Sequence, residues 1–434
     1  MPKGIRKLHI SLGEPNLTHF GGIFLIHHFC QKLKFKQRLQ NTVRQTRRQR
    51  GYNQAELTLA IIYALIVGIP RLSKTKILQG NGAFQKIIGL RSYPYASSLR
   101  RFIKSITKTT NDQLDSAHDA FRQKIFTLSK PSTSIIFDFD STVITVYGKY
   151  IEGAEVGYNP HKRGARSYQP LLCFEAHTRD FWHGILRPGD RYTSYGSVDF
   201  FKNCLAKVPS HIYRIRARAD SGFFDHKFIE ALEEAHVGYA VVVKLTKPIK
   251  RTVCTIRYRL FKSNAAVAEF TYQPLGWKTP HRFIAIRKPL ADKETNQLSL
   301  FSTGRYSYQV FVTNLPLQPE QVWYFYRPRA AIETDIRELK QSFSLAKIPT
   351  NSFQANQAFF SLLTFSYNIL NWFKRLCLPP RFKNAAAETI RQEFLVLPAR
   401  LVKSQNRNIL NLPSEYISKA TIDGIIKRID SLRP

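Results

Sequence analysis

The chain has 434 residues, of which 66 are Lys or Arg and 30 are Asp or Glu, giving a formal charge of +36. Hydrophobic residues make up 43% and aromatic residues 13%, which excludes an intrinsically disordered chain and, at this length, allows two or three domains. Such a charge attracts polyanions, so nucleic acid is the first candidate partner and an anionic membrane surface the second.

The cysteines and the apolar runs indicate the compartment. The five cysteines are scattered and form no CxxC pair, which argues against a zinc ribbon or a disulfide framework and indicates a reducing compartment. The longest apolar run, Leu57 to Ile69, is too short to span a bilayer, and the N-terminus shows no signal peptide. We therefore expect a soluble, cytoplasmic protein that does not enter a membrane.

Residues 1–130 are predicted to form an all-α, basic, DNA-binding region. Residues 31–50 carry eight basic side chains and no acid, a composition that favours phosphate contact. A Ser-capped helix near the end of this region carries Arg100, Arg101 and Lys104, which favours a helix-turn-helix that binds DNA through these three residues. A helical bundle that merely packs is the alternative interpretation.

Residues 131–245 change to a strand pattern. Apolar and polar residues alternate from Ser134, and two further strands follow closely enough to form a meander. A helix, a strand at 211–219, a second helix and a strand at 239–245 come next. This order predicts an α/β fold, namely the mixed sheet with helices of a ribonuclease-H-like core.

Residues 246–320 are predicted to form a β-rich insertion, and residues 321–380 the C-terminal helices of the core. The insertion contains four alternating segments, at 252–261, 266–275, 281–290 and 306–315. Residues 381–434 are basic, and the sequence assigns them no role.

Three acids are placed where chain geometry brings them together. Asp140 lies in the first strand, Asp220 ends the fourth, and Glu333 lies on a late helix that packs across the sheet. The first and fourth strands are neighbours in a ribonuclease-H-like sheet. Three converging carboxylates repel one another unless a metal neutralises them. Two Mg²⁺ ions about 4 Å apart suit in-line attack on a phosphodiester: one activates water or a 3′-hydroxyl and the other stabilises the departing oxygen.

The late stretch "YRPRAAIETDIRELK" places four side chains on one helical face. Tyr326, Arg329, Glu333 and Lys340 fall at offsets 0, 3, 7 and 14, which at about 100° per residue lie within about 60° of arc. Pro328 is tolerated in a first helical turn, which places Tyr326 at the cap. A solvated face of ion pairs is the alternative.

The spacing of this stretch matches Y-x2-R-x3-E-x6-K, and the chain thereby resembles a group of bacterial insertion-sequence DDE transposases. "DFDST", "RADSGF" and "YQVFVTN" are similar to other motif blocks of that group, over roughly residues 133–375. The resemblance implies a metal-dependent enzyme that nicks transposon ends and joins them to target DNA. It implies that Asp140, Asp220 and Glu333 bind two Mg²⁺ ions, with Mn²⁺ as a substitute.

The same resemblance implies partners and supporting residues. Tyr326, Arg329 and Lys340 become the phosphate-handling residues around the glutamate. The expected partner is double-stranded DNA, as terminal repeats and as target, and the protein is expected to act as a homodimer in the synaptic complex. In the cell it would then associate with the nucleoid through DNA.

Three alternatives remain open from the sequence. Asp138 and Asp140 point to the same face of a strand, so either is a candidate first ligand, although Asp140, followed by Ser141 and Thr142, fits the family block better. The same string resembles the nucleophile motif of haloacid-dehalogenase-type phosphatases, in which Asp138 attacks phosphate. A catalytically silent DNA-binding descendant of a transposase is the third.

Further DNA contacts are predicted outside the triad. The loop "GYNPHKRGARSY" offers Lys162, Arg163 and Arg166, and Arg218 belongs to a row of arginines that leads to Asp220. Trp277 is a candidate for stacking on a flipped base, worth about 1–3 kcal/mol, against a position in the core of the insertion. Two further tryptophans, Trp182 and Trp323, are predicted to be core residues.

Overall fold

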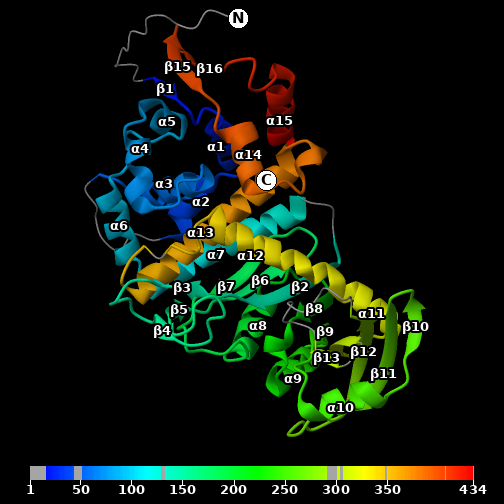
Figure 1. Ribbon diagram of the computed structural model, residues 1–434. Coiled ribbons are helices and arrows are strands. Elements are labelled where there is room, and N and C mark those ends of the chain that lie inside the picture. Colours follow the sequence, from blue (N-terminus) through cyan, green and yellow to red (C-terminus); the bar gives the residue numbers. More distant parts are fainter. Residues whose placement is uncertain are drawn as a thin grey trace, which may run out of the picture. The chain divides into compact units, whose positions relative to one another are not determined.

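The computed structural model describes residues 16–43, 51–128, 132–290, 301–303, 306–347, 349–405 and 407–433. The chain divides into two compact units (Figure 1). The first joins Met1–Ala117 to Trp372–Pro434, and the second is His118–Asn371. The basic tail therefore folds with the N-terminal helices.

The first unit is mainly helical. Its central helix begins with a capping box, in which Asn53 Oδ1 accepts a hydrogen bond from the Glu56 N–H (2.9 Å) and Glu56 Oε2 accepts one from the Asn53 N–H (3.2 Å). Apart from Glu56, every residue of that helix is buried. Its helices are α1 (Ile23–Lys32), α2 (Phe35–Thr42), α3 (Gln54–Ile66), η1 (Leu72–Thr75), α4 (Lys76–Gln79), α5 (Gly82–Ile87), α6 (Ala96–Ser105), the start of α7 (Lys108–Leu128), the end of α13 (Phe353–Cys377), η4 (Pro380–Phe382), α14 (Ala387–Ile390), the π-helical η5 (Arg391–Leu395) and α15 (Lys419–Ser431). A small antiparallel sheet has the order β1 (Leu17–Thr18), β15 (Ala399–Ser404), β16 (Arg407–Asn411).

The second unit is built on one large mixed sheet. Its strand order is β10-β11-β12-β14-β9-β8-β2-β6-β7, with β13 paired to β14. The strands are β2 (Ser134–Ser141), β6 (Leu171–Glu175), β7 (Phe181–Ile185), β8 (Arg214–Ala219), β9 (Gly238–Val242), β10 (Arg259–Lys262), β11 (Ala265–Tyr272), β12 (His281–Pro289), β13 (Phe301–Thr303) and β14 (Tyr306–Thr313). A second, three-stranded sheet has the order β3 (Ile144–Thr145), β5 (Arg166–Tyr168), β4 (Glu155–Val156).

The pairing directions divide the large sheet into two halves. β2, β6 and β7 form an antiparallel meander, while β8 runs parallel to β2 and β9 runs parallel to β8. β14 pairs antiparallel with β9 and begins a second antiparallel run through β12, β11 and β10. The predicted β-rich segment therefore extends the main sheet, and the mixed α/β class is confirmed.

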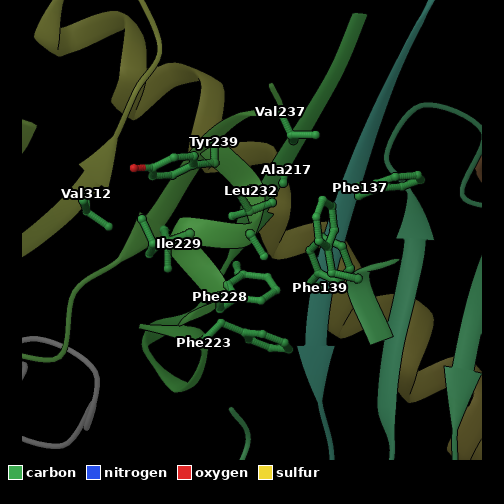
Figure 2. Close-up of a cluster of buried hydrophobic side chains, with 14 of the residues drawn as sticks. Phe137, Phe139, Ala217, Phe223, Phe228, Ile229, Leu232, Val237, Tyr239 and Val312 are labelled. Carbon is green, nitrogen blue, oxygen red and sulfur yellow. The ribbon is translucent and has the colours of Figure 1, made fainter. Parts of the chain in front are cut away.

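Helices cover both faces of this sheet. They are the rest of α7, α8 (Ser197–Ala206), η2 (Ser221–Phe223), α9 (His226–Glu234), α10 (Lys247–Thr255), α11 (Pro319–Tyr326), η3 (Arg327–Ala330), α12 (Ala331–Gln341) and most of α13. On one face, Phe139 packs edge-on against Phe228 of α9, with ring centroids 5.8 Å apart (Figure 2). On the other face, Phe311 of β14 packs against Tyr326 of α11 at 4.8 Å. Because side chains alternate along β2, Asp138 and Asp140 face away from the phenylalanine core.

Two predicted local features are wrong. Residues 252–261 were expected as one strand, but 252–255 form the end of α10 and only 259–261 belong to a strand, β10. Pro248 lies at the start of α10, and Ile249 and Val253, one helical turn apart, are its buried residues, a spacing that favours a helix. The helix that carries Arg100 is also not capped by serine: α6 has Tyr95 as N-cap, without a side-chain cap hydrogen bond.

Candidate active site

Asp140 and Asp220 lie at the adjoining ends of two neighbouring strands. β2 and β8 pair in parallel, with Phe139 opposite Ala219, and the next residue in each segment is one of the aspartates. The expectation that the first and fourth strands are neighbours is confirmed. Two carboxylates from segments 80 residues apart are thus brought to the same edge of the sheet by strand pairing.

The late motif does not form the single helix expected from its spacing. Tyr326 is the last residue of α11, a 3₁₀ segment that contains Pro328 follows, and Glu333 lies in the first turn of α12. Proline lacks an N–H group and cannot continue the hydrogen-bond ladder of α11, which explains the break. Lys340 lies in the last turn of α12.

One pocket contains the three carboxylates. Asp140, Asp220 and Glu333 all line it, together with Tyr326 and Arg329, and its volume is about 810 Å³. Glu333 is exposed, whereas Asp140 is only 9% exposed. The sheet edge and α12 therefore place the predicted triad around a shared, accessible space.

The three carboxylates do not, however, converge tightly in this structure. Within the described ranges, no three His, Cys, Asp or Glu side chains lie close enough together to hold a metal ion. Asp140 is instead paired with Arg329, whose Nη2 lies 3.1 Å from Asp140 Oδ2 and donates to the carbonyl of Phe139 at 2.8 Å. The donor set still fits a hard divalent cation, because carboxylate oxygens are the ligands that Mg²⁺ prefers and all three carboxylates line the pocket.

The charges of the site perturb one another. Burial raises the pKa of Asp140 to about 6; Arg329 opposes this shift, while Asp220 and Glu333 add to it. Burial alone would lower the pKa of Arg329, but the neighbouring acids, Asp140 first, outweigh burial and raise it. Burial also raises the pKa of Tyr326 to about 12 and lowers that of Lys340. A buried carboxyl whose pKa is raised partly by neighbouring acids, as that of Asp140 is, is typical of functional sites.

Asp138 is engaged elsewhere. Arg218 binds it through two hydrogen bonds, Nε to Oδ1 at 2.6 Å and Nη2 to Oδ2 at 2.7 Å, and its Nη1 donates to the carbonyl of Phe325 at 2.8 Å. Both residues are only 3% exposed, and Asp138 does not line the pocket. This placement favours Asp140 as the ligand, leaves Asp138 no access as a phosphatase nucleophile, and removes Arg218 from the predicted DNA surface.

The remaining residues that were predicted to contact DNA differ in their exposure and in the unit to which they belong. Arg100, Arg101 and Lys104 are exposed on α6, in the first unit. Lys162 and Arg163 are exposed in the second unit.

Arg166 is half-buried and its guanidinium binds the protein's own backbone. It donates to the carbonyls of Ala154 (2.5 Å), Lys149 and Ile151 (3.3 Å). Those bonds fix the loop before β5, so we assign Arg166 a structural role rather than a DNA contact.

Trp277 lies between β11 and β12 and is half-buried. Its ring is 5.1 Å from that of Phe224 and 4.9 Å from that of His281. The ring packs against the hydrophobic core of the second unit. This position favours the predicted core role of Trp277 over stacking on a flipped base. Trp182 and Trp323 are 2% and 5% exposed, as predicted for core residues.

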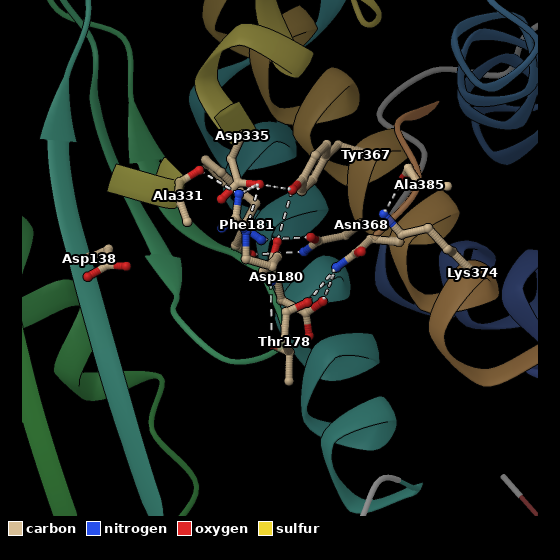
Figure 3. A network of polar contacts seen from close by, with 12 residues as sticks. Asp138, Thr178, Asp180, Phe181, Ala331, Asp335, Tyr367, Asn368, Lys374 and Ala385 are labelled. Atoms are coloured by element: carbon tan, nitrogen blue, oxygen red, sulfur yellow. Dashed lines mark hydrogen bonds and ion pairs between the residues drawn. The ribbon is translucent and has the colours of Figure 1, made fainter. Parts of the chain in front are cut away.

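A polar network on α12 was not predicted. Arg179 donates to Asp335 Oδ1 through Nε (3.0 Å) and Nη2 (2.7 Å), and the hydroxyl of Tyr367 donates to the same oxygen at 3.1 Å (Figure 3). Arg179 also donates to the carbonyl of Ala331. The network joins the β6–β7 turn to the helix that carries Glu333, and single-sequence patterns carry no signal for it.

Four basic residues that line the pocket were also missed. They are Lys244, just after β9, Lys250 in α10, Lys288 in β12 and Arg327 in η3. Arg327 is adjacent to Tyr326 of the late motif, which was a signal for it, whereas the three lysines come from segments whose packing the sequence does not reveal.

Comparisons with known proteins identify the family. The family model described as "Transposase DDE domain group 1" matches residues 3–434. Among curated sequences no protein matches. In the described part of the chain, no helix is long and apolar enough to cross a membrane.

Two solved structures match this one over different shares of the chain. A piggyBac transposase synaptic complex with hairpin DNA matches with a TM-score of 0.46 and 10% identity, over 96% of this chain and 86% of that chain. A Mos1 transposase paired-end complex with the left transposon end matches with a TM-score of 0.18 and 9% identity, over 45% of this chain and 60% of that chain. It is the family model, which extends over nearly the whole sequence, that shows the chain to be a member of the DDE transposase family, group 1.

Proposed function

We propose that this transposase cuts DNA at the ends of a mobile element and joins those ends to target DNA by metal-dependent phosphoryl transfer. The observation that carries the proposal is the shared pocket of Asp140, Asp220 and Glu333 in a chain of charge +36. Two-metal phosphodiester chemistry uses carboxylates around one shared space and a surface that attracts DNA. The pocket and the net charge of this chain supply these two features.

In this proposal the three carboxylates hold Mg²⁺, as two ions, with Mn²⁺ as a substitute. The bound metal supplies Lewis acidity at the scissile phosphate. Arg329 balances the charge of Asp140 and lines the same pocket, so its guanidinium lies beside the position of the substrate phosphate. Lys340 adds positive charge near Asp140, since that carboxylate affects its pKa. Tyr326 borders the pocket where α11 ends.

The finer family assignment is also a proposal. The Y-x2-R-x3-E-x6-K spacing supports a bacterial insertion-sequence transposase. The order β7-β6-β2-β8-β9, three antiparallel strands followed by two parallel ones, supports a ribonuclease-H-like core. We propose the core at 131–245 and 321–380, interrupted by the β-rich segment at 246–320, with residues 1–130 as the DNA-binding region and no role assigned to 381–434.

The partner in this proposal is double-stranded DNA, as terminal inverted repeats and as target. The exposed basic residues of α6, namely Arg100, Arg101 and Lys104, support a contact by the first unit. We propose a homodimer in the synaptic complex and action in the cytoplasm at the nucleoid.

The deciding experiment is cleavage of a labelled duplex that carries the sequence flanking the gene. Nicking at the element boundary is expected with Mg²⁺, and it should be lost with EDTA and in Glu333→Gln, which removes one carboxylate charge with little change of shape. Glu234→Gln, at an exposed position of α9 outside the pocket, is the matched control and should cut like the wild type. Cutting by Glu333→Gln at the wild-type rate would refute the assignment of Glu333.

A silent DNA-binding descendant is the second candidate, and the pairing of Asp140 with Arg329 favours it. In such a protein the arginine would take the place of the metal permanently. Tight, salt-sensitive binding of the same duplex without any nick, with Mg²⁺ or Mn²⁺, would establish this candidate instead.

A further inference from the structure

The pocket continues from the carboxylates to a basic end. Lys244, Lys250, Lys288 and Arg327 line that end and come from four separate elements: the segment after β9, α10, β12 and η3. The acids among the residues that line the pocket are Asp140 and Asp220 on the strand ends and Glu333 on α12. The acidic and the basic side chains that line the pocket are therefore contributed by different elements.

Two cations of this end, Lys288 and Arg327, lie over one buried indole. Lys288 Nζ lies 5.0 Å and Arg327 Cζ 4.6 Å from the centroid of the Trp323 ring, and Lys262 Nζ lies 5.4 Å from it. Trp323 is 5% exposed and belongs to the core beneath α11. Cation–π attraction holds the charged groups at these distances, so the indole forms a fixed floor for the basic end.

The two cations are close enough to share one ligand. Because both Lys288 and Arg327 lie within about 5 Å of one ring, they are no more than about 10 Å apart and can approach the same anionic strand. With a volume of about 810 Å³, the pocket lies within the range of about 300–1,000 Å³ typical of ligand sites, which is more than a single phosphate group needs.

We propose that the basic end binds a backbone phosphate of the DNA strand next to the scissile phosphate, with Lys288 and Arg327 as its main contacts and Lys244 at its rim. This inference rests on the proposed function, because it takes the scissile phosphate to lie at the carboxylates. A strand that enters the pocket then places its neighbouring phosphate toward the cations. The β-rich segment, through Lys288, thereby becomes part of the DNA site.

The test replaces single phosphates by neutral methylphosphonates in the duplex that carries the sequence flanking the gene. Binding is measured by fluorescence anisotropy with the wild type and with Lys288→Met, Arg327→Met and the double variant. Methionine keeps an unbranched chain over Trp323 but removes the charge. In the wild type, one neutral linkage beside the boundary phosphate should weaken binding about tenfold, the usual effect of losing a charged contact. In the double variant the same linkage should change binding less than twofold.

Lys202→Ala, at an exposed position of α8, is the matched control: it removes one charge and should keep the tenfold effect. Thermal unfolding of each variant separates loss of contact from loss of fold. A methylphosphonate effect that stays tenfold in the double variant, or that is missing in the wild type, overturns the inference. The measurement does not require cleavage, so the phosphate site stands or falls separately from the cutting activity.

Discussion

At the scale of single residues, the pair of Asp138 and Arg218 holds together the segments that carry the candidate site. Asp138 lies two residues before Asp140, and Arg218 lies two residues before Asp220. The third hydrogen bond of Arg218 goes to Phe325, at the end of the helix that precedes the glutamate. A buried charge pair of this kind is weak evidence for net stability, but it is costly to break because one charge then stays buried without a partner.

Arg218→Ala is therefore expected to lower the free energy of unfolding by about 3–5 kcal/mol. Arg214→Ala, at an exposed position of the same strand, is the control and should change it by less than about 0.5 kcal/mol. Urea unfolding followed by circular dichroism measures both. Equal midpoints and slopes for the two variants would contradict the buried pair. The double variant Asp138→Leu with Arg218→Met should recover part of the loss, since no unpaired charge remains.

At the scale of elements, α7 and α13 are joined to the sheet through one histidine and one asparagine. Asn368 pairs with the backbone of β7, accepting from the N–H of Phe181 and donating to its carbonyl, both at 2.8 Å. Its Nδ2 also lies 2.7 Å from Nε2 of His118, which accepts this bond when neutral. His118 is 4% exposed, and burial, reinforced by Arg122, lowers its pKa well below the ordinary 6.5.

This histidine makes stability depend on pH in a defined direction. Because its pKa is lower in the folded state, the unfolded chain takes up a proton first as pH falls below 6.5, and unfolding becomes more favourable by up to about 1.4 kcal/mol per pH unit. His118→Gln can still accept the hydrogen bond but does not titrate. The loss of unfolding free energy between pH 7 and pH 5 should therefore be smaller in His118→Gln than in the wild type, as measured by urea unfolding at both values. An identical loss would show that His118 is not buried neutral.

At the scale of the whole molecule, the charge of +36 is expected to govern the proposed interaction with DNA. If the protein neutralises about 6–10 phosphates, affinity should fall about 10³–10⁵-fold between roughly 50 and 200 mM salt. Fluorescence anisotropy with a duplex at several salt concentrations measures this slope, and a flat response would contradict a DNA-binding role.

The triple variant Arg100→Ala, Arg101→Ala, Lys104→Ala tests the share of α6 in that slope. If these residues contact phosphates, the slope of log affinity against log salt should become smaller by about 3. An unchanged slope would place the DNA contacts of the protein elsewhere.

Much of the second unit could be predicted because alternating apolar and polar residues identify its strands. The segments at 211–219, 239–245, 266–275, 281–290 and 306–315 all contain observed strands. The failures were local. The segment at 252–261 mixes apolar and polar residues in a way that suits both a helix and a strand, and its first four residues join α10, whose buried face contains Ile249 and Val253. The late motif was predicted as one face of one helix, but Pro328 divides it.

The sequence by itself determined the charge, the strand and helix types, and the candidate acids, because composition and periodicity are local properties of the chain. It left open whether Asp138 or Asp140 faces the pocket, since both point to the same side of the strand. Only the tertiary structure decided this, because the partner that buries Asp138, Arg218, lies 80 residues away and reaches it through strand pairing. The basic end of the pocket was hidden for the same reason: Lys288 and Arg327 meet at Trp323 only after β12 and α11 have packed together.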